Sequence, residues 1–397
     1  MSSTTPTPSN TLSRAGESSH RSQTMRICIA SKEPRQRAET FIRTQMNELP
    51  FQVRVLSGLP PLNDELQGDI QSRRLLARVR NRLRRASHEQ LLLESQTAYL
   101  HQTEPSLVLA EYGSVGVDMS EACVAAGVPL VVHFHGNDAH NHRAAGEWRD
   151  GYQRMFAAAT ALVAVSHDMR DRLIALGASP AKVARIPYWV NPDHFSGAKP
   201  GESPPRFLAV GRFVEKKAQH LTLLAFADVV RDIPDAQLTL IGNGPLLGPC
   251  RQLAVVLGIA DRVDFLGQQD HARVAEEMRR SRAFVQHSVQ ASDGDCEGTP
   301  VAILEAQASG LPVVATRHTG IKEAVVHERT GLLVDELDVQ NMAEAMRRLA
   351  RAPELAADFG VQARRHIAEH YSRVQTLDRL AQLLQDIGAG RTFDVSA

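Results

Sequence analysis

The sequence predicts an α/β protein in which two doubly wound, Rossmann-like domains face a central cleft. Its 397 residues are enough for about two or three domains. Short apolar segments alternate with longer segments of helical periodicity, which is typical of parallel sheets covered by helices. A stretch rich in Gly, Ser and Pro at residues 193–205 separates two sets of these elements and indicates a linker. In such an arrangement a ligand lies in the cleft, at the carboxyl ends of the strands.

The composition excludes several classes of protein. Hydrophobic residues make up 43% of the chain and charged residues 23%, which excludes general disorder. Lys and Arg number 45, as do Asp and Glu, so no net charge attracts nucleic acid. No apolar run approaches the ~18–20 residues that cross a bilayer. The four cysteines have neither C-x-x-C nor metal-ligand spacing, which suits a reducing cytoplasm better than a disulfide framework.

The chain begins with a tail, residues 1–24, that is rich in Ser, Thr and Pro. It has too little apolar content to fold, so we expect it to be disordered. It also lacks the apolar segment of a signal peptide, so no export is implied. The first strand begins directly after Met25, which we interpret as the start of the folded part or of the protein itself.

The first domain is expected over residues 25–192. Its strands are the short apolar runs at residues 27–30, 107–110, 130–133 and 162–165. Between the first two strands, seven arginines from Arg73 to Arg85 alternate with apolar residues at helical spacing, without an acidic residue. Such a basic amphipathic helix predicts peripheral contact with an anionic membrane; a solvated helix face is the alternative.

Two histidines follow one another closely at the end of the third strand, in the segment H-F-H-G-N-D. A histidine at the carboxyl end of a strand faces the cleft, whereas His133, as a strand residue, can also fill the core. Two histidines at positions i and i+2 are compatible with zinc, but no third ligand stands at a standard spacing. We therefore expect no metal here.

The second domain is expected over residues 206–370, and its alternation is clearer. Strands are predicted at residues 206–210, 238–241, 263–266, 283–286, 312–315 and 331–334. Helices are predicted at about residues 218–231, 246–257, 272–280, 300–309 and 339–351.

Cations and glycines follow the first two strands of this domain. Arg212 and Lys217 come directly after the first strand, where they can bind phosphate; a solvated basic turn is the alternative. The next strand ends in I-G-N-G-P, and its glycines Gly242 and Gly244 resemble a dinucleotide fingerprint. No acidic residue follows at the usual distance, so we expect a tight turn that brings backbone close to a nucleotide rather than a nicotinamide site.

The densest motif is E-G-T-P-V-A-I-L-E-A at residues 297–306. Thr299 is a suitable N-cap and Pro300 a suitable first helical residue, while Gly310 is a suitable helix terminator. The free amides and positive dipole end of this short helix form an anion site. Glu297 and Glu305 lie eight residues apart and can hold hydroxyls at the two ends of a sugar nucleotide; solvated surface glutamates are the alternative.

Directly before this motif, Asp293 and Asp295 form D-G-D. This spacing can bind a divalent metal together with a nucleoside diphosphate in one class of transferase. We expect a polar, glycine-hinged loop at the cleft mouth instead, because the pair lies inside a different motif.

Together, these motifs resemble those of the retaining glycosyltransferases of family 4, which have the two-domain GT-B architecture. The resemblance rests on E-G-x-P-x-x-x-L-E-A-x-A-x-G-x-P-V-V-A-T, on a Gly-Arg pair with a Lys five residues after the Arg, on I-G-x-G-P and on H-G-x-D. It covers nearly all of residues 25–388, and it implies that residues 371–388 form a C-terminal helix that crosses back to the first domain.

The resemblance implies a role for each matched residue. His135 and Glu297 act on the donor sugar, and Glu305 holds the ribose. The donor diphosphate is bound by Arg212, Lys217, Gly298 and Thr299. The nucleotide is approached by Gly242, Gly244 and Gly267. No metal or cofactor is needed, because helix dipole and cations stabilise the leaving group, whose phosphate is thought to help deprotonate the acceptor.

Three departures from the family pattern concern the acceptor and the hinge. The loop after the first strand looks like the S-E-T-F-I variant of transferases that build bacterial exopolysaccharides such as colanic acid, with Ala38 for Ser. Glu39 and Thr40, with Asp138 of H-G-x-D, are the implied acceptor residues, and a lipid-linked oligosaccharide is the implied acceptor. Trp189 replaces a Gly near the hinge, and Ala218 replaces the Gly that usually follows the Lys.

The sequence thus predicts a metal-independent enzyme that moves a hexose, with retention, from a UDP- or GDP-linked donor. The acceptor would be a glycan or a polyprenyl-linked oligosaccharide in polysaccharide biosynthesis, in the cytoplasm or at the inner face of the membrane. Three other hypotheses stay open: a UDP-sugar epimerase of the same fold, an inactive nucleotide-sugar-binding protein, and, more distantly, a dehydrogenase.

Overall fold

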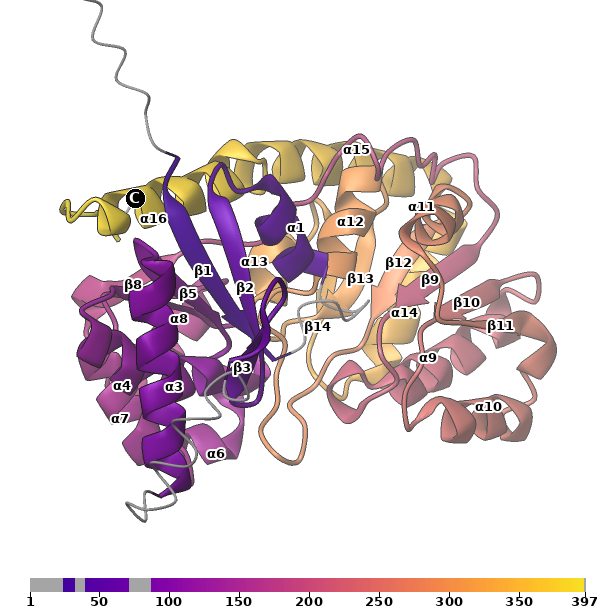
Figure 1. The fold of residues 1–397 in the computed structure, drawn as a ribbon. Helices are drawn as coiled ribbons and strands as arrows, with labels where there is room; N and C mark the ends of the chain where they lie inside the picture. Colours follow the sequence, from indigo (N-terminus) through magenta and orange to yellow (C-terminus); the bar gives the residue numbers. More distant parts are fainter. Residues whose placement is uncertain (1–23, 33–39, 71–86, 396–397) are drawn as a thin grey trace, which may run out of the picture.

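The computed structural model describes residues 24–32, 40–70 and 87–395. It shows two α/β domains side by side, each built on one twisted sheet (Figure 1). The first sheet has the strand order β4-β3-β2-β1-β5-β6-β7-β8, and the second has the order β11-β10-β9-β12-β13-β14. The predicted fold class is therefore confirmed. Residues 1–23 and the arginines from Arg73 to Arg85 lie outside the described residues.

The first sheet is parallel except for a short antiparallel hairpin at its edge. Its strands are β1 (Arg26–Ser31), β2 (Gln52–Gly58), β3 (Pro61–Asp64), β4 (Gly68–Asp69), β5 (Leu107–Glu111), β6 (Leu130–His133), β7 (Ala161–Ala164) and β8 (Val183–Arg185). Its helices are α1 (Thr40–Glu48), α3 (His88–Thr103), α4 (Gly113–Ala126), α5 (Asn137–His140), α6 (His142–Ala145), α7 (Arg149–Ala158) and α8 (His167–Ala175). The central strands are continuously apolar because helices cover both faces.

The second sheet is parallel throughout. Its strands are β9 (Arg206–Val210), β10 (Gln237–Ile241), β11 (Val263–Gly267), β12 (Ala283–Gln286), β13 (Val313–Thr316) and β14 (Gly331–Val334). Its helices are α9 (Gln219–Asp232), α10 (Leu247–Val256), α11 (His271–Arg279), α12 (Val301–Ser309), α13 (Ile321–Ala324), α14 (Val339–Arg351) and α15 (Pro353–His370). Each predicted strand and helix of this half is present within one residue at either end.

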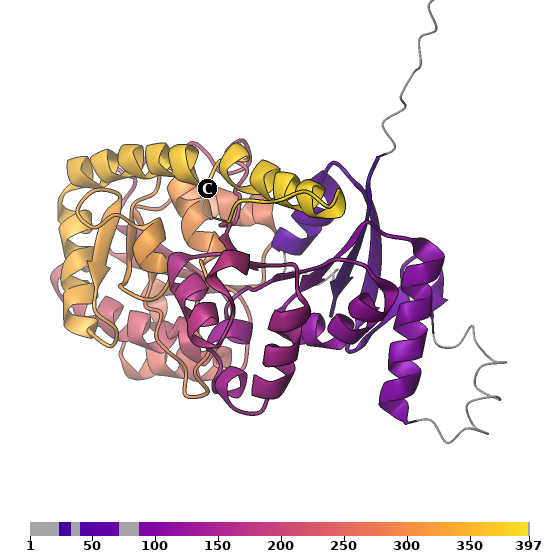
Figure 2. The same ribbon diagram turned by 90° about the vertical axis from the view of Figure 1, so that its left-hand side faces the viewer.

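The end of the chain returns to the first domain. A π-helical turn (Val374–Asp378) follows α15 and leads into α16 (Arg379–Gly388). Leu380, Leu384 and Ile387 of α16 share one buried cluster with Ile27 of β1 and Leu107 of β5. In Figures 1 and 2, α15 runs along the second domain and α16 along the first.

The sequence patterns missed β2, β3, β4 and β8, the outer strands on the two sides of the first sheet. β2 reads Q-V-R-V-L-S-G and is only partly buried, so its apolar alternation is interrupted, and β8 is three residues long. All four cysteines are free and buried, as their spacing indicated. No helix of the described residues is long and apolar enough to span a bilayer.

Candidate active site between the two domains

The two sheets bring the predicted motifs to one place. In the second sheet, β9 lies between β10 and β12, where the strand order reverses, and ligands of such sheets bind at this point. Lys217 follows β9 and Glu297 follows β12. The loop after β6 faces them from the first domain, since a Cβ added to Gly136 would lie 3.0 Å from the Cys296 carbonyl oxygen. The domains are therefore closed on each other here.

An ion pair occupies the centre of this place. Lys217 Nζ lies 3.1 Å from Glu297 Oε1, and the two side chains are only 13% and 8% exposed. Burial lowers the pKa of Lys217 despite the attraction of Glu297. Burial alone would raise the pKa of Glu297, but Lys217 and Lys216 outweigh it and the net pKa is lowered. Arg212 is exposed and close enough that its charge contributes to the lowered pKa of Lys217.

In the Glu297 loop, one backbone amide has a hydrogen-bond acceptor and the next two have none in the part of the chain that the structure describes. The Glu297 N–H donates to His318 Nε2 at 3.2 Å, and His318 Nδ1 bonds Glu336 at 2.6 Å, so the proton of this buried ring is on Nδ1. Gly298 and Thr299 are buried residues whose N–H groups donate no hydrogen bond to the described residues. Buried amides without acceptors beside a lysine are the elements of an anion site.

Thr299 does not cap the helix, contrary to the sequence prediction. The N-cap of α12 is Pro300, and the Thr299 hydroxyl donates instead to the Val165 carbonyl oxygen of the first domain at 3.1 Å. The other boundary is as predicted, because Gly310 ends α12 with φ +88°. The sequence could not show that the first domain offers a competing acceptor for Thr299.

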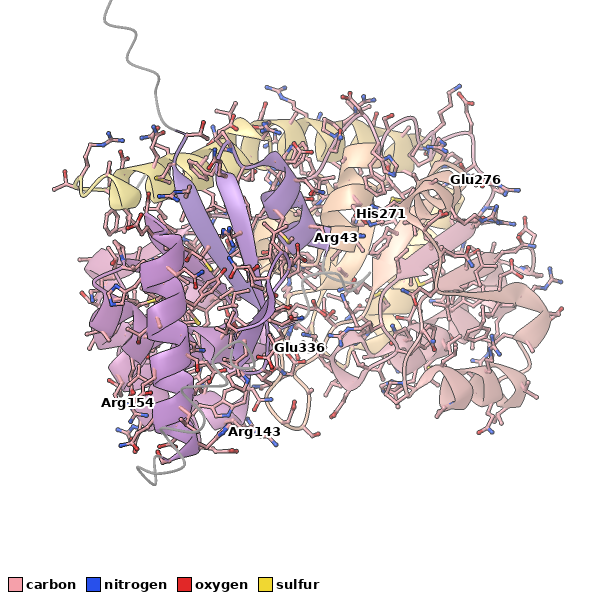
Figure 3. All side chains as sticks on the ribbon, viewed as in Figure 1. Arg43, Arg143, Arg154, His271, Glu276 and Glu336 are labelled. Carbon is pink, nitrogen blue, oxygen red and sulfur yellow. The ribbon has the colours of Figure 1, made fainter. Side chains whose placement is uncertain are left out.

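Glu305 lies on α12 at the edge of a pocket of about 210 Å³ between the domains. Its side chain is buried and makes no hydrogen bond or ion pair to the described residues, and burial raises its pKa to about 7. The pocket is also lined by Phe41 and Thr44 of α1, Asn191 of the connector, and His271 of α11. Figure 3 shows Arg43 and His271 near each other where α1 meets the second domain. A carboxylate without a partner in such a pocket is able to accept two hydroxyl hydrogen bonds.

In the structure, Gly242 and Gly244 are required by close backbone contacts within the second domain, whereas the sequence suggested an approach to a nucleotide. A Cβ on Gly242 would lie 1.9 Å from the Gly211 carbonyl oxygen, and one on Gly244 would lie 2.5 Å from that of Phe213. These glycines therefore let two strand-end loops pack backbone against backbone. Gly267 alone has open space within 4 Å of its Cβ position. The contact of all three with a nucleotide stays a prediction.

His135 is deeply buried in the first domain. Its Nε2 lies 2.7 Å from Glu111, its Nδ1 lies 2.8 Å from the Tyr188 hydroxyl, and its side chain is 3% exposed. The backbone of His135, not its ring, faces the second domain, because a Cβ on Gly298 would lie 2.6 Å from the His135 carbonyl oxygen. A contact between the ring and the donor sugar stays a prediction.

Asp138 has a structural role, and its assignment to the acceptor stays a prediction. Its carboxylate accepts hydrogen bonds from the amides of Gly113, His135 and Gly136 at 2.9–3.0 Å, and the residue is buried. With these bonds it fixes the His135–Gly136 turn. Of the other two acceptor candidates, Glu39 and the Thr40 side chain lie outside what the structure describes.

The D-x-D segment is engaged with other residues. Asp293 accepts from the Asn141 amide at 2.9 Å, across the domain boundary, and Asp295 pairs with Lys216 at 2.9 Å. Gly294 between them has φ +84°. The segment is thus a glycine-hinged loop, in which Lys216 neutralises Asp295 and neutral N–H groups hydrogen-bond Asp293.

The structure describes both residues that depart from the family pattern near the hinge and after the lysine, Trp189 and Ala218. Trp189 lies in the connector, with the Arg373 guanidinium 5.7 Å from its ring centroid. Ala218 has φ +43° at the start of α9, a left-handed conformation that a glycine adopts without strain.

Sequence reasoning missed several residues of the site, namely Lys216, His318, Glu111, Tyr188 and Phe41. Three of them stood within its reach: Lys216 adjoins Lys217, and Glu111 and His318 stand at the carboxyl ends of predicted strands. Phe41 stood in the S-E-T-F-I segment without being singled out, and Tyr188 carried no local signal. Only the closed fold brings α1 and the connector against His135.

Comparison with known proteins shows the relatives of this chain. Residues 191–366 match a family model described as glycosyl transferases group 1, and residues 40–194 match one described as glycosyltransferase family 4. The putative colanic acid biosynthesis glycosyltransferase WcaL of Escherichia coli is 30% identical over 286 residues, 70% of this chain and 70% of that protein. The amylovoran biosynthesis glycosyltransferase AmsK of Erwinia amylovora is 28% identical over 275 residues, 69% of this chain and 67% of that protein.

Solved structures agree on the fold. The Anabaena protein HepE, solved in complex with UDP and glucose, superposes with a TM-score of 0.71 at 18% identity, covering 91% of this chain and all of that one.

Proposed function

Because the chain belongs to the family 4, group 1 glycosyltransferases of the GT-B fold, we propose that it transfers a hexose, with retention and without a metal, from a UDP- or GDP-linked sugar. It is a glycosyltransferase involved in exopolysaccharide or glycolipid biosynthesis. The proposed acceptor is a glycan or a lipid-linked oligosaccharide. The proposed place of action is the cytoplasm or the inner membrane face.

One observation carries the proposal: a buried Lys217–Glu297 pair beside the unbonded amides of Gly298 and Thr299. A donor diphosphate can take the place of Glu297 as the partner of Lys217 and accept from both amides. Glu297 then becomes free to accept hydroxyl hydrogen bonds from the sugar. The group that departs is an anion, and these donors stabilise it more as its charge develops, which lowers the barrier of transfer.

The same arrangement supports the proposals of retention and metal independence. Lys217, Arg212 and the amides would all hold the leaving diphosphate on one face of the sugar. A phosphate oxygen kept there can take the proton of an acceptor that attacks from that face. Asp293 and Asp295, which could have held a metal, already bond Asn141 and Lys216.

The first test is thermal unfolding against UDP, GDP, ADP, NAD and NADP, each with and without magnesium. Ligand at about 100 times its Kd stabilises the folded state by roughly 2.7 kcal/mol. We expect one nucleoside diphosphate to stabilise the protein equally with and without magnesium, and to lose this effect in Lys217→Ala. A magnesium requirement would refute the metal-free proposal, and a shift with only NAD or NADP would refute transfer altogether.

The second test is turnover of the donor that carries the base identified in this way. Transfer to an acceptor releases the nucleoside diphosphate, whereas an epimerase returns a changed nucleotide sugar. Proton NMR of the product gives the anomeric configuration, and inversion would refute retention.

A further inference from the structure

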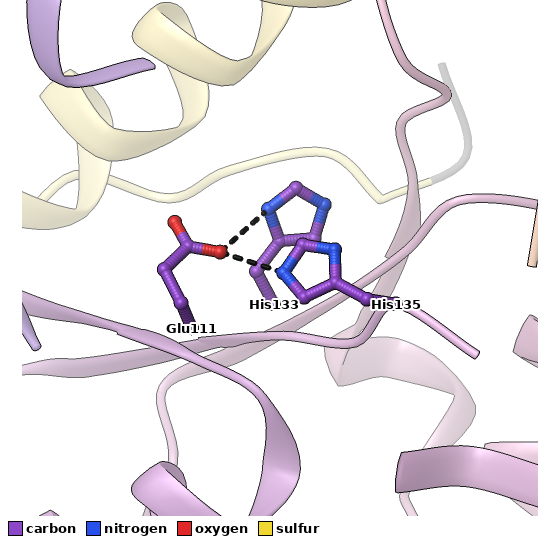
Figure 4. Close-up of side chains that lie close together, drawn as sticks. All are labelled: Glu111, His133 and His135. Carbon is purple, nitrogen blue, oxygen red and sulfur yellow. Dashed lines mark hydrogen bonds and ion pairs between the residues drawn. The ribbon is translucent and has the colours of Figure 1, made fainter. Parts of the chain in front are cut away.

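A buried network of polar side chains lies behind the His135–Gly136 turn. Glu111 at the end of β5 and His133 at the end of β6 are paired in register, and His135 follows two residues later. Figure 4 shows the three side chains together. Glu111 Oε2 lies 2.7 Å from His135 Nε2 and 3.5 Å from His133 Nδ1, and each side chain is at most 3% exposed.

Residues from two other elements complete the network. The Tyr188 hydroxyl of the connector lies 2.8 Å from His135 Nδ1, and the Gln45 amide of α1 lies 3.0 Å from His133 Nδ1. Phe41 packs against both the His135 and Tyr188 rings, with centroids 4.4 and 4.9 Å away. The His135 ring is thus held on both nitrogens and on one face.

The network contains features that lower the stability of the folded protein. Glu111 Oε1 and His133 Nε2 are buried without a hydrogen-bond partner among the described residues. Tyr112, directly after Glu111, has φ +78°, a strained value for a residue with a side chain. Buried polar atoms without partners and strained backbone persist mainly at functional sites.

We propose that Glu111 and Tyr188 are positioning residues of the transfer reaction: they hold the His135 ring in one tautomer and one orientation, and so fix the His135–Gly136 turn against the Glu297–Gly298 loop. With Glu111 ionised, the Tyr188 hydroxyl donates to Nδ1, and the Nε2–H donates to Glu111. The inference rests on the proposed function, because it takes the Glu297 loop as the donor site.

The turn and the donor loop are in direct contact, so a displaced ring displaces the site. A Cβ added to Gly136 would lie 3.1 Å from the Gly298 amide nitrogen. That amide is one of the two proposed to bind the diphosphate. Loss of either bond to the His135 ring moves the first-domain turn, whereas the nucleotide is also proposed to be held by Lys217, Thr299 and Glu305 of the second domain. Transfer should therefore decrease more than nucleotide affinity.

A bound metal ion is the competing interpretation of the same three side chains. One carboxylate and two imidazoles suit zinc. However, the His133 nitrogen that faces Glu111 already accepts from Gln45, and Tyr188 bonds the far nitrogen of His135. The three atoms that would bind an ion, Glu111 Oε2, His133 Nδ1 and His135 Nε2, each already have a partner. We therefore favour the network, and metal content is measured as part of the test.

The network predicts a pH dependence. Burial and Asp138 raise the pKa of Glu111 to about 7, against the opposing effect of His133, while burial lowers the pKa of His135 to about 4. The titratable groups that face Glu111 are therefore two neutral histidines, Asp138 and Tyr188. Protonation of Glu111 reverses its bond to His135 and moves the ring proton to Nδ1. The rate should rise as the pH rises through about 7.

The test compares Glu111→Leu, Glu111→Gln and Tyr188→Phe with Tyr99→Phe. Tyr99 is a matched control because its buried hydroxyl bonds Asp64 of β3 and no residue of the network, so its loss should lower stability alone. The assay is nucleoside diphosphate release from UDP-glucose and from GDP-mannose, with nucleotide affinity measured in parallel. We expect Glu111→Leu and Tyr188→Phe to lower kcat at least tenfold with a much smaller change in nucleotide Kd. Glu111→Gln should retain most of the transfer rate, but its rate should no longer rise as the pH rises through about 7.

Three results would overturn the inference. One is an unchanged kcat in folded Glu111→Leu and Tyr188→Phe. Another is one equivalent of zinc in the purified wild type that the variants lack. The third comes from nitrogen-15 NMR of the wild type, which needs neither a variant nor a substrate: His135 protonated on Nδ1 at pH 8 contradicts the network. If the wild type binds the nucleotide but releases no nucleoside diphosphate from either sugar donor, the proposed function is refuted. The NMR result on the His135 tautomer would still hold.

Discussion

Glu305→Gln should make the protein more stable while it weakens nucleotide binding. Glu305 is 7% exposed and has no charged partner among the described residues, and burial raises its pKa from 4.5 to about 7. A glutamine keeps the shape and removes the charge. The side chain is therefore expected to oppose folding when it is ionised and to serve binding.

The magnitude follows from the pKa change. A rise from 4.5 to about 7 corresponds to about 3 kcal/mol, as an upper limit. The folded state holds the proton more tightly than the unfolded state, so the free energy of unfolding decreases as the pH rises from about 4.5 to 7. In the glutamine variant the free energy of unfolding does not decrease for this reason. It should match the wild type near pH 4.5 and exceed it by up to about 3 kcal/mol at pH 8.

The assay is denaturant unfolding of both proteins at several pH values, repeated with saturating nucleoside diphosphate. Glu121→Gln, on the exposed side of α4, is the control and should change neither quantity. If Glu305→Gln is no more stable than the wild type at pH 8, the carboxylate has a partner and the reasoning fails. If the nucleotide still stabilises the variant fully, Glu305 does not hold the ribose.

Three further predictions concern single contacts. Lys217→Ala leaves Glu297 buried without its partner and should lower the free energy of unfolding by about 3 kcal/mol and abolish nucleotide binding, measured by calorimetry; restored stability in Lys217→Met with Glu297→Gln would support this cause. Asp138→Ala leaves three buried amides without an acceptor and should cost about 3 kcal/mol in denaturant unfolding; a cost below about 1 kcal/mol would contradict its structural role. Ala218→Gly relieves a left-handed backbone and should leave stability unchanged or raise it by up to about 1 kcal/mol, whereas destabilisation would show that the Ala218 methyl contributes more by packing than the strain costs.

Much of the fold could be predicted from the sequence because the central strands are buried on both faces. β6, β9 and β12 have the predicted bounds, since their apolar runs need no partner to be recognised. β14, at the edge of the second sheet, has them as well, because all four of its residues are buried. β2 escaped because Arg54 interrupts its apolar pattern, and the strand is only partly buried at the edge of the parallel part of the sheet.

The residues of the candidate site also fall into two groups, those predictable from the sequence and those that only the structure shows. The sequence by itself determined the types and order of Lys217, Glu297 and Glu305, the proposed donor-site residues, because turn chemistry and helix ends are local. Only the tertiary structure decided that Asp138 holds amides, that Thr299 bonds the first domain, and that Glu111 meets His135. These partners come from different elements, and which elements become neighbours depends on strand order and domain closure, which no local pattern encodes.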